Sequence, residues 1–255
     1  MELTFFDAST YIGLPAVEPR LGPPGAPVDA AGLLAEMDRA GIERALVWHV
    51  AQRDYEVTAG NRLLAEAIAS HERLTGCWSL LPPQTGELGE IGEFFKAAGR
   101  ARVKAFRAWP KANRYLLRAD ALGEVLERMI AARAPLILSL PEHVEWANVY
   151  ELLAELPELT VILADLGNWG QDRFFRPLIE RYPNVYVELG GYFVDGGIEA
   201  FVADYGAGRM LFGTGFPLMY HGANMLMLAH AEISDADKQA IASGNLARLL
   251  SEVKL

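Results

Sequence analysis

The chain has 255 residues, 51% of them hydrophobic, which is long enough to bury one substantial core. Its net charge of −10 and pI near 5.0 argue against a broad basic surface for nucleic acid or anionic lipid, and they favour a small-molecule substrate. A single cysteine, Cys77, excludes an intramolecular disulfide, and no apolar run approaches the roughly 20 residues that span a bilayer, so we expect a cytoplasmic protein without membrane contact.

Short runs rich in Val, Ile and Leu alternate with longer segments of helical periodicity, a pattern that predicts repeated βα units and a parallel sheet. The first seven residues lack the basic start and apolar core of a secretory signal, and they predict a strand instead. We expect eight strands, at residues 3–6, 44–50, 74–80, 103–108, 136–140, 160–164, 185–189 and 210–212. Several are apolar on both faces, as strands covered by helices must be.

Amphipathic segments between these strands predict helices, among them residues 30–39, 58–71, 119–132 and 146–155. Gly41 follows the first of these helices, where a left-handed cap suits glycine. Ser234 with Asp237 three residues later resembles a capping box, which opens a terminal helix expected to reach about Val253. Residues 13–27 are rich in Pro and Gly and predict an extended loop.

Eight parallel strands with no obvious antiparallel edge favour an α/β fold, a single (β/α)8 TIM barrel with an extra C-terminal helix over residues 1–255. A doubly wound open sheet is the alternative, which the lack of a glycine-rich dinucleotide motif after the first strand and of a P-loop weakens. In a barrel the chemistry lies at the C-terminal ends of the strands. Those ends therefore hold the candidate site.

Three segments at these ends carry a resemblance to a known family. They are residues 7–13 (DASTYIG), 162–167 (ILADLG) and 211–217 (LFGTGFP), after the first, sixth and eighth strands. In this order they resemble the barrel of the amidohydrolase-2 group, which includes metal-dependent hydrolases, decarboxylases related to aminocarboxymuconate-semialdehyde decarboxylase, and pyrone-dicarboxylate lactonases. Residues 103–110 (VKAFRAWP) and 241–250 (IASGNLARLL) are similar to that group's fourth strand and closing helix. The resemblance covers nearly the whole chain.

The same resemblance places other residue types where the group has metal ligands. Ser9 and Tyr11 stand at the two first-strand histidines, Ser139 and Asp165 at the histidines of the fifth and sixth strands, and Gly215 at the eighth-strand aspartate. Because a catalytic zinc needs about three His, Asp, Glu or Cys ligands, we expect no metal and no other cofactor. A relocated metal site is the alternative, and its ligands would come from His49, His143, Asp165, Glu188 and His221.

The ionisable residues at the strand ends predict acid/base chemistry. Alternation places Asp165 on one face of its strand with Val161 and Leu163, and the resemblance turns that face into the barrel, where a desolvated carboxylate needs a partner. Several acids at one opening repel each other, so that one of them would stay protonated and serve as a general acid. The candidate catalytic residues are Asp165, His49, Asp7 and Glu188.

Arg107 shares a face of the fourth strand with Trp109. An inward Arg107 would bind a substrate carboxylate through two hydrogen bonds, or else pair with an acid of the mouth. The candidate substrate-binding residues are Arg107, Tyr11, Ser9, Trp109, Ser139, His143, Trp169 and His221. The leading hypothesis is a metal-independent hydrolase, or a related lyase, for a small carboxylated substrate such as a lactone or an amide. The alternative is a non-catalytic barrel that binds a ligand or a partner, and the sequence leaves a homo-oligomer open.

Overall fold

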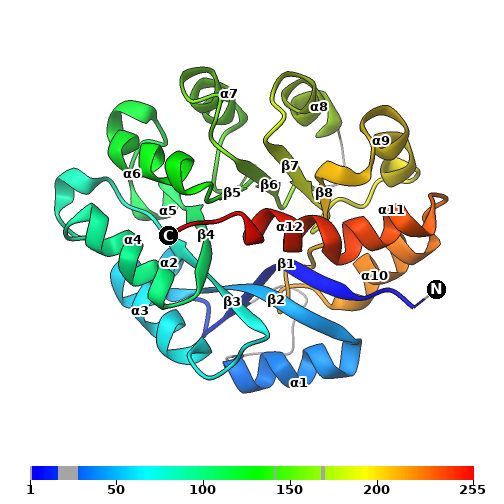
Figure 1. Ribbon diagram of the computed structural model, residues 1–255, viewed down its shortest axis with the longest axis horizontal. Helices are drawn as coiled ribbons and strands as arrows, with labels where there is room; N and C mark the ends of the chain where they lie inside the picture. The colour runs from blue at the N-terminus through cyan, green and yellow to red at the C-terminus, as the bar shows by residue number, and fades with distance from the viewer. Residues whose placement is uncertain (1, 17–27, 141, 168–169) are drawn as a thin grey trace.

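The protein forms an eight-stranded parallel barrel, seen here in a computed structural model that describes residues 2–16, 28–140, 142–167 and 170–255. The strands pair in chain order, and helices between successive strands cover the outside of the sheet (Figure 1). The strands are β1 (Phe5–Ile12), β2 (Ile42–His49), β3 (Leu74–Ser79), β4 (Val103–Ala108), β5 (Leu136–Ser139), β6 (Val161–Ala164), β7 (Val185–Glu188) and β8 (Met210–Leu211). The predicted (β/α)8 TIM barrel with a C-terminal helix is confirmed.

The helices follow the predicted amphipathic segments closely. They are α1 (Ala30–Ala40), α2 (Ala51–Asp54), α3 (Val57–Ile68), α4 (Ile91–Arg100), α5 (Pro110–Asn113), α6 (Ala119–Ala132), α7 (Trp146–Glu155), α8 (Asp172–Arg181), α9 (Gly197–Tyr205), α10 (His221–His230), α11 (Asp235–Gln239) and α12 (Asn245–Ser251), with single turns η1 (Pro83–Thr85), η2 (Ala207–Arg209) and η3 (Ala240–Gly244). Gly41 caps α1 in the left-handed conformation, at φ 76°. The Ser234 hydroxyl accepts from the Asp237 amide at 3.1 Å, so both predicted end signals are confirmed.

The first strand is longer than predicted, because it continues through the polar residues after Phe6. Backbone bonds hold this stretch to the chain after β8: the Gly215 amide donates to the Ser9 carbonyl at 2.8 Å, and the Tyr11 amide donates to the Phe216 carbonyl at 2.9 Å. These bonds join the first strand to the last and bring the two strand ends together. Hydropathy could not indicate them, since each bond joins residues that lie more than 200 positions apart in the chain.

The C-terminal segment covers the end of the barrel where the strands begin. Figure 1 shows α12 crossing the centre of the strand ring. The Asn245 amide group donates to the carbonyls of Ala207 and Met210 beside the start of β8, and Lys104, near the start of β4, donates to the Val253 carbonyl at 2.9 Å. Leu246 of α12 joins the apolar cluster inside the barrel. The opposite end is therefore left for the site.

The face assigned to the sixth strand was wrong. Ile162 and Ala164 belong to the apolar cluster inside the barrel, whereas Leu163 belongs to the layer between sheet and helices. β6 ends at Ala164, and Asp165 adopts a left-handed backbone at φ 57°. This turn breaks the alternation, and the Asp165 side chain is exposed instead of desolvated inside the barrel.

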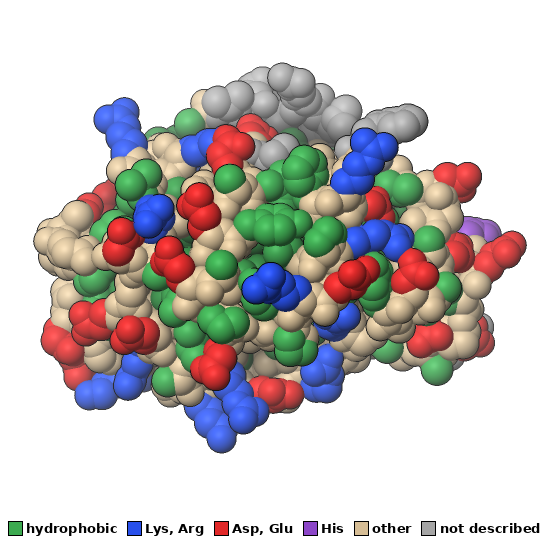
Figure 2. Space-filling view, turned by 90° about the horizontal axis from the view of Figure 1, so that it is seen from above, with side chains coloured by type: hydrophobic (Ala, Val, Ile, Leu, Met, Phe, Trp, Pro, Cys, Tyr) green, Lys and Arg blue, Asp and Glu red, His purple; other side chains and the backbone are tan. Residues whose placement is uncertain are grey.

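The described helices are too short or too polar to span a membrane, and the face in Figure 2 carries charges of both signs. Within the described ranges no helix is both long and apolar enough to cross a bilayer. On the face drawn in Figure 2, acidic and basic side chains are interspersed, and no basic patch forms there.

Candidate active site

Arg107 is a buried cation that points into the barrel from β4. Its side chain is 2% exposed. Nη1 donates to the Ser139 hydroxyl at 3.2 Å and Nη2 to the Ser9 hydroxyl at 3.4 Å, while Nε has no partner. Among the described residues no carboxylate forms an ion pair with it. A buried charge is normally paired, so an unpaired guanidinium is unusual among the described residues.

Two tryptophan rings support the guanidinium. Its Cζ lies 5.3 Å from the ring centroid of Trp48 and 5.1 Å from that of Trp109, and the two rings are themselves 4.7 Å apart. The negative faces of indole rings attract such a cation. Cys77 of β3 also lies against the guanidinium, and burial raises the pKa of its thiol to about 12, so this residue stays neutral. Arg107 is thus held by neutral groups.

Glu188, the last residue of β7, is a fully buried acid. Its Oε1 accepts from the Gly190 amide at 2.6 Å, and its Oε2 has no partner. Burial and then the charge of Asp165 raise the pKa of the Glu188 carboxyl to about 8, against the opposing effect of Arg107. The raised pKa favours the protonated form of this side chain, the form that repulsion among several neighbouring acids also favours.

Two glycines make room for the Glu188 carboxyl. A Cβ at Gly213 would lie 1.7 Å from Glu188 Oε1, and a Cβ at Gly190 would lie 2.6 Å from the same atom. Every other residue type would displace the acid from this position. The glycines were not singled out from the sequence, although Gly213 is part of the segment that carries the family resemblance.

Asp7, Thr214 and His221 form a buried polar network beside Glu188. The Thr214 hydroxyl donates to Asp7 Oδ2 at 2.6 Å, and the Asp7 Oδ1 accepts from the amides of Ser9 and Thr214. His221 Nδ1 lies 3.2 Å from the Thr214 hydroxyl and 3.5 Å from Asp7 Oδ2, with Nε2 unpartnered. Asp7 is therefore fully engaged by donors of β1 and of the chain after β8. This arrangement favours a holding role for Asp7 over proton transfer.

Asp165 and His143 lie at the mouth, next to the buried groups. The charge of Asp165 acts on both Glu188 and His143. Burial, and then the charge of Arg53, lower the pKa of His143, whose ring meets that of Trp109 edge-on at 4.8 Å. The charge of Asp165 thus reaches Glu188, although the Asp165 side chain is exposed.

His49 and Tyr11 lie further toward the rim of the mouth. His49 Nδ1 accepts from the Ala51 amide at 3.1 Å, and burial lowers its pKa. Its contacts stabilise the start of α2, and within the described chain none of them joins it to Asp165. Tyr11 packs on Trp48 at 5.1 Å, and burial raises its pKa. Trp169 lies outside the described residues.

Three residues of the site were missed in the sequence. Trp48, one position before His49, faces the interior and contacts the buried cation. Arg53 lies over both Trp48 and Trp109 and pairs with Asp54 at 2.5 Å. Thr214 links the β1 acid to His221. Alternation along β2 was a signal that could have found Trp48, whereas nothing in the local pattern marked the other two.

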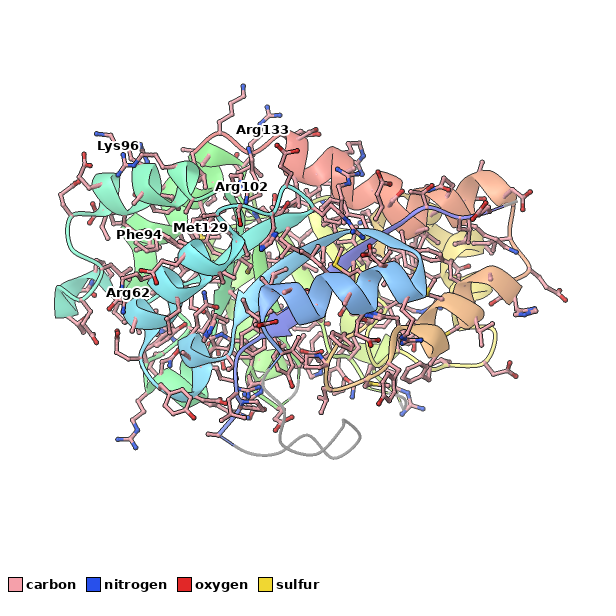
Figure 3. All side chains as sticks on the ribbon, turned by 90° about the horizontal axis from the view of Figure 1, so that it is seen from below. Arg62, Phe94, Lys96, Arg102, Met129 and Arg133 are labelled. Carbon is pink, nitrogen blue, oxygen red and sulfur yellow. The ribbon has the colours of Figure 1, made fainter. Side chains whose placement is uncertain are left out.

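A groove of about 1050 Å³ lies elsewhere, outside the barrel between α3 and α4. Its walls include Arg62, Phe94 and Arg102, which Figure 3 shows on these helices and on the turn before β4. Trp78, from the outer face of β3, is at its base. The groove shares no lining residue with the buried cluster at the strand ends, so we treat it as separate from the candidate site.

The fold and this cluster define a TIM barrel with buried ionisable groups at the C-terminal ends of its strands, the place where such barrels hold their active sites. The family model described as amidohydrolase matches residues 8–251. The chain therefore belongs to the amidohydrolase family. No curated protein matches it.

Solved structures share the fold at low sequence identity. 2,6-dihydroxybenzoate decarboxylase from Rhizobium is 18% identical, with a TM-score of 0.72 over 98% of this chain and 99% of the other. Dihydroxybenzoic acid decarboxylase from Polaromonas sp. JS666, which has bound manganese and an inhibitor, is 20% identical, with a TM-score of 0.70 over 98% and 97%. A probable 2-pyrone-4,6-dicarboxylic acid hydrolase from Acinetobacter baumannii, with citric acid bound, is 11% identical, with a TM-score of 0.69 over 98% and 100%.

The side chains at the resembled metal positions do not fit a divalent metal ion. In the described part of the chain, no group of three or more His, Cys, Asp or Glu side chains could hold one. Ser9 and Ser139 instead contact the buried guanidinium of Arg107. A divalent ion beside that guanidinium would be repelled by it, since both are cations with little water between them.

Proposed function

We propose that this protein is an amidohydrolase-like hydrolase that acts without a metal on a small carboxylated substrate, a lactone or an amide, or that it catalyses a related lyase reaction on such a molecule. The observation that carries the proposal is the buried Arg107, which lacks an acidic partner among the described residues, next to the protonated acid Glu188. The first group suits a substrate carboxylate, and the second suits proton donation.

In this proposal each group of the site has a role. Arg107 binds the carboxylate and, with Ser9 and Ser139, fixes its orientation. In hydrolysis, water adds to the acyl carbon, and Asp165 takes the proton that water loses. The acyl–oxygen or acyl–nitrogen bond then breaks, and Glu188 gives its proton to the leaving group. Both acids lie close enough to influence each other's charge, which suits a pair that exchanges protons with one substrate.

The neighbouring structures agree with the substrate class. The solved proteins above are decarboxylases of hydroxybenzoates and a probable hydrolase of a pyrone dicarboxylate, and each of these substrates carries a carboxylate. This chain keeps the barrel and a cation inside it. A small substrate also suits a site in which Arg107 and Glu188 are almost fully buried.

The test is a screen of small carboxylated lactones, amides and hydroxybenzoates, each assayed with and without a chelator. We expect turnover that the chelator leaves unchanged and that Glu188→Gln lowers by roughly 100-fold, the usual scale of general acid catalysis. Turnover that is abolished by the chelator and restored by a metal would contradict the metal-free chemistry. A protein that binds carboxylates but converts none would be the non-catalytic binding barrel.

A further inference from the structure

The guanidinium of Arg107 contacts serines on two other strands of the barrel. Its two terminal nitrogens donate to hydroxyls on β1 and β5, those of Ser9 and Ser139. The resemblance to the amidohydrolase-2 group places one metal-binding histidine at each of these two serines. The guanidinium therefore spans two positions from which the related barrels hold their metal ion.

We propose that the guanidinium of Arg107 takes the place of the family's metal ion, as a built-in cation to which the substrate carboxylate binds. This inference rests on the proposed function for its substrate class. It goes beyond that function by linking two replacements. Arg107 of β4 supplies the positive charge of a metal ion, and serines stand at two positions where the related barrels have metal-binding histidines.

The surroundings of the guanidinium suit a permanent cation. A guanidinium keeps its charge in proteins and is more weakly hydrated than an ammonium, so burial costs it less. Trp48 and Trp109 offer ring faces within 5.3 Å, and the two serine hydroxyls and the Cys77 thiol are neutral. The cation is thus stabilised without an acid, which leaves its charge available to a bound anion.

The same contacts make the guanidinium and a metal site mutually exclusive. The Ser9 and Ser139 hydroxyls already lie 3.4 and 3.2 Å from the guanidinium nitrogens. A histidine at either position would extend beyond the hydroxyl and overlap the Arg107 side chain. Short side chains at both positions are therefore what an arginine in this place requires.

A guanidinium differs from a metal ion in what it can do. It offers N–H donors and charge to two carboxylate oxygens, but it has no open coordination position at which water could bind and lose a proton. The cation then serves to bind and orient the substrate. Proton transfer depends on the neighbouring carboxyl groups, in agreement with the buried, unpartnered Oε2 of Glu188.

Binding can be measured without turnover. The probe is 4-nitrobenzoate, whose nitroaromatic ring quenches tryptophan fluorescence, because Trp48 and Trp109 flank the proposed carboxylate position. It is titrated into the wild type, Arg107→Met, Arg107→Lys and the control Arg44→Met, which removes a guanidinium that lies 4.4 Å above the Phe6 ring instead. Each protein is also titrated with Mn²⁺, whose free ion is counted by electron paramagnetic resonance.

We expect the wild type and Arg44→Met to bind 4-nitrobenzoate alike and to take up no stoichiometric Mn²⁺. Arg107→Met should weaken probe binding by about 10- to 100-fold, the worth of hydrogen bonds between charged groups. Arg107→Lys keeps the charge but cannot bond both oxygens, so it should fall between the two. This second variant serves as the test should Arg107→Met fail to fold.

Three results would overturn the inference. In the first, the wild type binds one equivalent of Mn²⁺ and binds the probe only when Mn²⁺ is present. In the second, the wild type and both Arg107 variants bind the probe with equal affinity. In the third, the wild type does not bind the probe. The proposed function fails separately. A wild type that binds the probe through Arg107 but converts no carboxylated substrate would refute the function and leave the inference standing.

Discussion

Replacement of Glu188 by Gln should change how the stability of the protein depends on pH. The carboxyl is fully buried and its pKa is raised from 4.5 to about 8 by burial and by the charge of Asp165. Because the folded pKa lies above the unfolded one, the folded state holds this proton more tightly. The resulting stability is fully present below about pH 4.5 and is lost as pH rises through 8. At 1.36 kcal/mol per pKa unit, the raised pKa corresponds to about 5 kcal/mol across that window.

Gln keeps the shape of the side chain and can still accept from the Gly190 amide, but it does not titrate. Urea unfolding, followed by tryptophan fluorescence at several pH values between 4.5 and 8.5, gives the free energy of unfolding of both proteins. We expect the wild type to lose several kcal/mol relative to Glu188→Gln as the pH rises. The control is Glu124→Gln, which replaces an exposed acid on α6 and should run parallel to the wild type. A parallel curve for Glu188→Gln would refute the assignment of a protonated buried acid.

Three further substitutions test the surroundings of this acid. Gly213→Ala would place a methyl group 1.7 Å from Glu188 Oε1 and should cost about 1–3 kcal/mol in urea unfolding, whereas Gly123→Ala, in open space on α6, should stabilise by about 0.5–1 kcal/mol; equal effects would contradict the packing. Thr214→Val removes the hydroxyl that bonds to the Asp7 carboxylate and should lower the free energy of unfolding by about 1–3 kcal/mol. Thr214→Ser keeps the hydroxyl, so this variant should unfold with wild-type stability; a loss as large as that of Thr214→Val would contradict the role of the hydroxyl. Asp165→Asn should lower turnover by roughly 100-fold, with a cooperative fold, and should shift the Glu188 transition to lower pH; unchanged turnover would remove Asp165 from the mechanism.

The fold could be predicted well because its signals are local and repeated. Buried strands, amphipathic helices and end signals such as Gly41 each depend on a few neighbouring residues. The first strand was the exception. Its second half is polar and is kept in the barrel by backbone bonds of Ser9 and Tyr11 to the chain after β8, so tertiary contacts overrode the local pattern.

The site could be predicted as a set of residues more reliably than as a geometry. Arg107 and Glu188 are buried at the strand ends. Alternation groups Arg107 with Trp109 on one face of its strand, but it does not say whether that face points into the barrel. The prediction for Asp165 failed because the face that holds Val161 and Leu163 points outward. The residue itself lies one position beyond its strand, in a left-handed turn. The hydrogen-bond partner of Asp7 could not be predicted from the sequence either. The Thr214 hydroxyl, not a nearby cation, donates to the Asp7 carboxylate, and this contact joins β1 to the segment after β8.

The most direct test of the account is a crystal structure of the wild type grown with Mn²⁺ and 4-nitrobenzoate, with data collected to locate manganese by its anomalous scattering. The account predicts the probe carboxylate against the terminal nitrogens of Arg107 and no manganese peak between Ser9 and Ser139. A manganese peak at that place, with the arginine side chain displaced from the two hydroxyls, would contradict the claim that a guanidinium has replaced the metal.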